Sequence, residues 1–356
     1  MNEEIQTEPS GQVSFIEKIK RYKIQLSVAA AVLVVAVSAA AHYKNELVKE
    51  KLVDGIAEYQ KNLLLVGGEI AYTSIDCSGL ISTDCEIKGI KLSFLGQEQL
   101  SIGSLRVGNV EEFQSLQELS EGKSIKTSID IEADSVALPK TLLAQVIAQN
   151  VSNAFQQNTL EKLGSVNLEL KGELEGDATT MKEIVIDRFV IDNAIMPIRF
   201  SMKAREVTGL APDSMILENF SLSAKNRALS DVTYGSVKSF VDLLKPEEKE
   251  VFLKEFGLTP MSMEDKEKAS LAINEAMAKR FEADLPETRG VVEKELLRAI
   301  IKLLKAEATE IVLEGENKKE LSIAQVQNAL SLSSTMSEDA AHKYMDDKFT
   351  ITVKAD

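Results

Sequence analysis

One uncharged run of eighteen residues, 24–41, constrains this chain more than any other feature of its sequence. A helix rises about 1.5 Å per residue, so a run of this length spans roughly 27 Å, close to the thickness of the hydrocarbon core of a bilayer. No second run of this kind follows it in the sequence. We therefore predict a single transmembrane helix at residues 24–41, which joins a tail, residues 1–23, to a large body on the other side of the membrane.

The charges that flank this run predict its orientation. Four cations fall within the six residues that precede it: Lys18, Lys20, Arg21 and Lys23. The lysines that follow it are more widely spaced and alternate with glutamates. Because the more cationic flank of a transmembrane helix tends to stay in the cytoplasm, we expect the tail inside the cell and the body outside the cytoplasm. In a bacterium with two membranes, the helix would cross the inner membrane and the body would be periplasmic.

A cleavable signal peptide is the alternative interpretation of the same run. Its apolar region would be residues 24–37, and the small residues 38–41 would form the cleavage site. Its charged leader would then be 23 residues long, which is unusual. Apolar residues also recur at helical spacing through residues 42–65, and this pattern predicts a juxtamembrane helix that continues the first one. We favour the uncleaved anchor, and both interpretations export the body.

The two cysteines of the chain agree with export. Cys77 and Cys85 each border a strand-like segment, and the short stretch between them contains Gly79, so we expect them at the neck of a hairpin. A disulfide there would close a loop of about nine residues, which the chain-entropy model values at roughly 2–3 kcal/mol. Disulfides persist outside the reducing cytosol. The alternative is a pair of unlinked small core residues. A metal site is not expected, because the two histidines, His42 and His342, lie at opposite ends of the chain.

Charge and composition exclude several classes of partner. The formal net charge of −15 argues against nucleic acid and against broad docking on anionic lipid headgroups, since both carry charge of the same sign. Aromatic residues make up 5% of the chain and tryptophan is absent. A carbohydrate-binding platform that stacks sugars on aromatic rings is therefore disfavoured, and the core must be built from Leu, Ile, Val and Ala.

The hydrophobic period changes several times along the exported part. Residues 66–135 and 165–225 alternate with period two and predict antiparallel strands, among them 69–77 and 195–207, whereas residues 139–163 have the period of an amphipathic helix. Residues 234–306 are helical in pattern, with a break near Pro246 and a cap at Ser262. Shorter segments complete the pattern: a strand at 310–314, helices at 323–332 and 338–346, and a strand at 348–353. The fold class is α+β, with a β-rich region at 66–233 and a helical region with terminal strands at 234–356.

No catalytic motif stands out, and we predict neither an enzyme nor a cofactor site. Ser120 and Lys123 match the spacing S-x-x-K, but in a turn where chance accounts for them, and no acidic pair is singled out among the 56 carboxylates. The positive candidate is an apolar groove on the strand faces. Its expected lining residues are Ile186, Phe189, Ile191, Ile195, Ile198, Phe200 and Met202. The alternative is that these side chains form a closed core between the sheet and the helices.

Two parts of the sequence resemble a known group of proteins. The couplet E-I-K-G-I-K-L-S at 86–93 and L-S-I-G-S-L-R-V at 100–107 follows the membrane segment, and residues 296–330 read helix, strand, polar turn, L-S and helix. These patterns resemble the AsmA-like and YdgA-like envelope proteins of Gram-negative bacteria, although Lys318 and Lys319 stand where that family often has prolines. The resemblance implies an inner-membrane anchor, a periplasmic β-rich body without known catalysis, and an apolar groove that carries or shields lipid. It includes no functional motif, so no site residue is transferred.

Two functions follow from these observations as expectations. The first is a membrane-anchored periplasmic protein that binds or shields lipid or another hydrophobic ligand. The second is a scaffold or accessory subunit of an envelope assembly, with residues 234–306 as the surface that contacts a protein partner. A hydrolase ranks third, because it would need a cleft with perturbed carboxylates.

Overall fold

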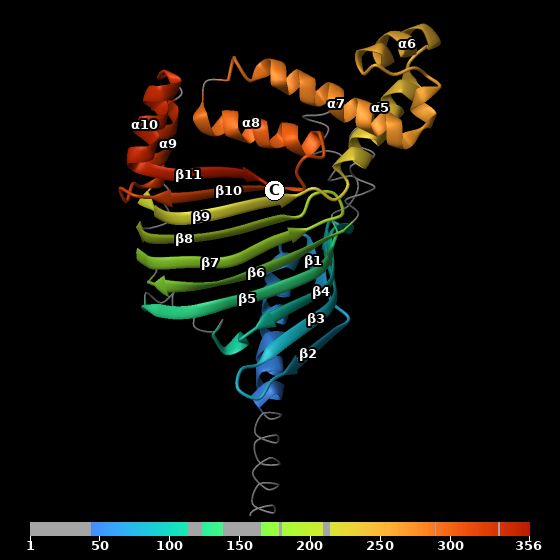
Figure 1. Cartoon of the computed structure of the whole chain (residues 1–356). Coiled ribbons are helices and arrows are strands. Elements are labelled where there is room, and N and C mark those ends of the chain that lie inside the picture. The colour runs from blue at the N-terminus through green and yellow to red at the C-terminus, as the bar shows by residue number, and fades with distance from the viewer. Residues whose placement is uncertain are drawn as a thin grey trace, which may run out of the picture.

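The computed structural model describes residues 44–112, 123–137, 165–177, 180–208, 214–288, 290–333 and 335–356. Within these ranges the chain has an α+β fold built on one antiparallel sheet of eleven strands (Figure 1). None of the helices in these ranges is both long enough and apolar enough to cross a bilayer. The predicted transmembrane helix at 24–41, the predicted amphipathic helix at 139–163 and Ser120 lie outside the described residues.

The sheet is a long meander in which each strand pairs with the next one in the chain, except at its first edge. Its order is β1-β3-β4-β5-β6-β7-β8-β9-β10-β11, and β2 also pairs with β3. The first six strands are β1 (Gly68–Ala71), β2 (Ser74–Ser78), β3 (Asp84–Phe94), β4 (Gln97–Gly108), β5 (Ile125–Val136) and β6 (Val166–Gly176). The remaining strands are β7 (Thr180–Asp192), β8 (Ile198–Thr208), β9 (Ile216–Lys225), β10 (Glu310–Asn317) and β11 (Phe349–Ala355). Thus β10 and β11, from the end of the chain, extend the same sheet beyond β9.

The expected strand across residues 69–77 is interrupted. β1 and β2 pair with β3 in one register, since Ala71 lies opposite Lys91 and Ser74 opposite Lys88. The break falls opposite Gly89, which has a φ of 62°. That left-handed conformation favours glycine, and the pairing with β3 stops at this position and resumes in the same register.

Among the described residues, helix 44–64 and the six labelled helices α5 to α10 accompany the sheet. Helix 44–64 crosses the strands at the first edge, and α8 (Val291–Leu304) runs alongside the edge strand β11 (Figure 1). The other helices are α5 (Leu229–Leu243), α6 (Pro246–Glu255), α7 (Lys266–Asp284), α9 (Ile323–Ser333) and α10 (Glu338–Lys348). We call α5, α6 and α7 the helical group; Figure 1 shows α6 beyond the end of the sheet, and α7 also packs against α8.

Three predicted boundaries are corrected. The helical region begins at Leu229 rather than 234, because the Asn226 side chain accepts a hydrogen bond from the Leu229 N–H. Asp265, not Ser262, caps α7, and the hydroxyl of Ser262 is instead engaged with the main chain of Thr259.

The third correction concerns β8, which begins at Ile198 rather than 195. The turn before it is held by Asn193, whose side-chain oxygen accepts hydrogen bonds from the N–H groups of Ile195 and Met196. Pro197 follows this turn and has no N–H to donate to a ladder. The chain can therefore enter the sheet only at the next residue.

The helical group has its own core. Leu253 from α6 and Ile273 from α7 are fully buried in a cluster that also contains Tyr234 and Met263. The Tyr234 hydroxyl donates to the Met263 carbonyl at 2.9 Å, which satisfies its polar end inside the cluster. Apolar packing of this kind holds α5, α6 and α7 together.

Candidate functional site: the apolar face of the sheet

The structure brings six of the seven predicted groove residues together on β7 and β8. Ile191 lies opposite Ile198, Phe189 opposite Phe200, and Ile186 opposite Met202. Ile186 and Phe189 are three residues apart and would face opposite sides of a regular strand. A β-bulge between them restores the alternation, so that all six side chains share one face.

Ile195 lies apart from these six residues. It belongs to the turn between β7 and β8 and is 8% exposed. Its carbonyl accepts hydrogen bonds from the N–H groups of Arg227 and Ala228, which lie just before α5. Ile195 thus ties the sheet to the start of the helical group and does not line the face.

Cross-strand pairing extends these apolar pairs from β2 to β11, and we call the resulting surface the apolar face. Its first row is Ile75, Ile87, Leu105, Ala133, Leu168, Ile191, Ile198, Ala224, Ile311 and Ala355. Its second row is Cys77, Cys85, Val107, Ile131, Leu170, Phe189, Phe200, Leu222, Leu313 and Val353. A third row, from β5 onward, is Ile129, Gly172, Ile186, Met202, Phe220, Gly315 and Ile351.

Sequence reasoning missed the members of these rows outside β7 and β8. The signal was present in the alternation of Val166, Leu168 and Leu170, which predicts one apolar side for β6. Alternation does not say which residues of different strands stand side by side, because that depends on register. The rows are therefore a finding of the structure.

Helix 44–64 covers the apolar face at the first edge. Its residues Leu52, Val53 and Ile56 pack against Ile75 and Ile87, which are 4% and 6% exposed. Cys77 and Cys85 lie under the same helix, are joined as a disulfide with an S–S distance of 2.01 Å, and Cys85 is fully buried.

The middle of the apolar face is more open. From β5 to β9, its large side chains in the second and third rows are half-buried, and Leu222 is 37% exposed. These residues are apolar, like the fully covered residues of the face, so residue type alone does not explain why their side chains are more exposed. The difference is that no described helix packs on them as helix 44–64 packs on β2 to β4.

Helices α9 and α10 cover the far end of the face. Phe349 and Met345 are buried there with Ala329, and Ile351 packs against them. A hollow of about 70 Å³ remains between α9 and the sheet, with a lining that includes Phe220, Val326 and Ile351. Gly315 forms its floor, where a Cβ atom would overlap the ring of Phe220. The apolar face therefore ends in a small apolar hollow.

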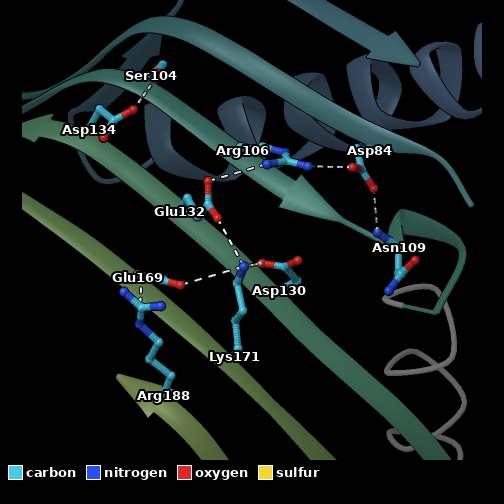
Figure 2. Close-up of polar contacts among 10 residues, drawn as sticks. All are labelled: Asp84, Ser104, Arg106, Asn109, Asp130, Glu132, Asp134, Glu169, Lys171 and Arg188. Atoms are coloured by element: carbon cyan, nitrogen blue, oxygen red, sulfur yellow. Dashed lines mark hydrogen bonds and ion pairs between the residues drawn. The ribbon is translucent and has the colours of Figure 1, made fainter. Parts of the chain in front are cut away.

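The opposite face of the sheet carries a ladder of ion pairs (Figure 2). Arg106 donates to Asp84 at 2.8 Å and to Glu132 at 3.4 Å, so it links β3, β4 and β5. The hydrogen bond to Asp84 raises the pKa of Arg106. Because these residues alternate along the strands with those of the apolar rows, the two faces of the sheet differ sharply in polarity.

The ladder continues onto β6 and β7 through Lys171. Glu132 and Glu169 lie directly opposite each other and would repel. The ammonium of Lys171 lies 3.2 Å from Glu132 and 3.6 Å from both Asp130 and Glu169, and the hydrogen bond to Glu132 raises the pKa of Lys171 (Figure 2). Arg188 adds a pair with Glu169 at 3.0 Å. These groups are solvated and paired, and they present a charged surface rather than a binding cleft.

Within the described ranges, no three side chains of the His, Cys, Asp and Glu types come together as metal ligands would. Comparison of the chain with models of known protein families gives no match, and comparison with curated protein sequences gives none either.

Proposed function

We propose that this chain is a single-pass inner-membrane protein with a cytoplasmic N-terminus, and that its periplasmic body binds or shields lipid or another hydrophobic ligand on the apolar face. The observation that carries the proposal is the contrast along single rows of that face. Ile75, Ile87 and Cys85 under helix 44–64 are buried, whereas the large side chains of the same rows on the middle strands are half-buried. Apolar area of this kind favours contact with hydrocarbon over contact with water.

The shape of the apolar face supports an elongated ligand. Neighbouring strands lie about 4.8 Å apart, so the four spacings across the open part, from β5 to β9, correspond to roughly 19 Å. The second row places a large apolar side chain on every one of these strands. An acyl chain lying across the strands would contact each of them in turn, whereas a compact ligand would use only a few.

A photoactivatable fatty acid tests the proposal. The full-length protein is incubated with the probe and irradiated, and cross-linked peptides are identified by mass spectrometry. We expect cross-links in β7, β8 and β9 because their half-buried side chains define the open part of the face. Cross-links spread evenly over the surface, or confined to residues 24–41, would contradict a binding role for the body.

A matched pair of variants sharpens this experiment. Phe200 and Ser201 are neighbours on β8 and point to opposite faces. Phe200→Lys places a charge on the apolar face and is expected to reduce labelling strongly, whereas Ser201→Lys places the same charge on the polar face and should leave labelling unchanged. Equal labelling of both variants would count against the apolar face as the binding surface, provided that both unfold at the wild-type temperature.

A second candidate function is that of an accessory subunit which docks on a protein partner through the helical group. The observation in its favour is the exposure of three large apolar side chains there: Leu243 at 75%, Val251 at 69% and Met261 at 85%. Val251 lines an open hollow of about 600 Å³ with Phe240 and Phe252. A photo-cross-linking amino acid at Val251 in cells should then capture one defined protein, and the same amino acid at Lys249 should capture less of it. Failure at Val251 would remove this candidate.

A further inference from the structure

The loop that joins β2 and β3 exposes two large apolar side chains. Leu80 is 65% exposed and Ile81 is 95% exposed. The loop is short, and the Cys77–Cys85 disulfide closes its neck. From Cys77 to Thr83 the chain carries no charged side chain. Exposure of adjacent large aliphatic side chains at a loop tip is costly in water and suits contact with an apolar medium.

Two hydrogen bonds attach this loop to the start of helix 44–64. The Lys44 ammonium donates to the Ile81 carbonyl at 2.6 Å, and the Asn45 side-chain amide donates to the Gly79 carbonyl at 3.1 Å. These bonds engage the main chain of the loop and leave the side chains of Leu80 and Ile81 pointing elsewhere. The loop tip is therefore held beside the first turn of the helix.

Glu111 completes this attachment from the other side. Its carboxylate lies 2.6 Å from the Lys44 ammonium and accepts hydrogen bonds from the hydroxyl and N–H of Thr83, which is fully buried. Burial tends to raise the pKa of Glu111, but the hydrogen bonds from Lys44 and Thr83 outweigh it and lower the pKa to about 2. The residue is thus ionised at neutral pH, and the loop, the helix start and residue 111 form one connected unit.

The position of this unit in the chain identifies the apolar medium. Lys44 follows the last residue of the predicted transmembrane segment by three positions, which corresponds to about 5 Å along a helix. A loop bonded to Lys44 and Asn45 therefore lies at the level where the hydrocarbon core gives way to the headgroups. Helix 44–64 begins at the end of the body where β2 and β3 lie (Figure 1), so the rest of the sheet extends away from that level.

We propose that Leu80 and Ile81 insert into the same bilayer that residues 24–41 span, and thereby make a second contact between the body and the membrane. This inference rests on the anchor of the proposed function and not on ligand binding by the apolar face. Two contacts fix the tilt of the body, whereas a single helix would leave it free to lean. We favour the bilayer as the medium that these side chains enter, because the loop is bonded to Lys44, which closely follows the predicted transmembrane segment.

The absence of tryptophan from the chain permits a direct test. Ile81→Trp introduces a single fluorophore, which is read in full-length protein reconstituted into phosphatidylcholine vesicles with or without bromine on the acyl chains. We expect a blue-shifted emission that brominated chains quench. Met261→Trp is the matched control, since Met261 is similarly exposed at 85% but lies in the helical group. Its emission should stay that of an indole in water and remain unquenched.

Each outcome decides the inference. Leu80→Trp is measured in parallel, and a water-like, unquenched emission from both loop variants in protein that floats with the vesicles would overturn the inference while leaving the proposed function intact. A blue shift without quenching, which grows with the ratio of protein to lipid, would assign the loop to contact with a second copy and also overturn it. Protein that does not float with vesicles would overturn both the anchor and this inference.

Discussion

The part of the apolar face under helix 44–64 and the part on the middle strands share the same rows but differ in cover. Ile87 and Ile191 both belong to the first row, yet Ile87 is 6% exposed beneath the helix and Ile191 is half-buried. The strands alternate in the same way in both parts, and the ion-pair ladder lies behind both. An apolar sheet face thus becomes a core only where another element packs on it.

The largest expected loss of stability comes from a substitution in the part of the apolar face under helix 44–64. Ile87→Ala should lower the free energy of unfolding by about 2–5 kcal/mol, since it removes a buried side chain and leaves a cavity. Ile191→Ala, in the same row, should cost clearly less because water already reaches part of its side chain. Urea unfolding of the two variants measures the difference. Equal losses would mean that the middle of the face is as well covered in solution as the first edge.

Removal of the disulfide comes next in size. Replacing both cysteines, Cys77→Ser with Cys85→Ser, should lower stability by roughly 2–3 kcal/mol, because a closed loop of about nine residues becomes free in the unfolded chain. The loss should localise to the part under helix 44–64, where Cys85 is fully buried. Hydrogen exchange would show faster exchange in β2, β3 and the helix while β7 and β8 keep their wild-type rates. Uniformly faster exchange would show that the two parts of the face unfold as one unit.

The pH dependence of stability should show an effect of intermediate size, which arises from Glu111 near the start of helix 44–64. The pKa of Glu111 falls from its ordinary 4.5 to about 2 in the folded chain. Because the folded pKa is depressed, the stability that ionised Glu111 adds is fully present above about pH 4.5 and is lost as the pH falls towards 2. Glu111→Gln should therefore flatten the dependence of stability on pH between those values. Thermal unfolding at several pH values measures it, and an unchanged slope in the variant would show that other carboxylates carry the effect.

The smallest expected effect lies on the polar face. Arg106 is about half exposed, and exposed ion pairs contribute little, so Arg106→Gln should lower stability by no more than about 1 kcal/mol. High salt should reduce even this difference, since it screens the wild-type pairs. A loss as large as that of Ile87→Ala would show that the ladder, and not the apolar packing, determines stability at this edge.

Several features could be predicted from the sequence because they depend on local patterns. The alternation in 165–176 predicts β6, the helical spacing in 42–65 predicts the helix that the structure places at 44–64, and the two cysteines border strands that pair. Misplaced boundaries arose where one side chain decided the outcome. The turn at Asn193 moves the start of β8 to a later residue, and Asp265 rather than Ser262 caps α7. The hydrophobic period does not show which of several neighbouring polar side chains will make such a hydrogen bond.

By itself, the sequence determined which residues of each strand share a side, since neighbouring side chains on a strand must point in opposite directions. Only the tertiary structure decided that these sides align into rows from Ile75 to Ala355, because register is set by pairing between strands and by the bulge between Ile186 and Phe189. The tertiary structure also decided that helix 44–64 covers the rows at the first edge, whereas their large side chains on the middle strands stay half-buried. Burial depends on what packs above a surface, and no pattern within a strand contains that information.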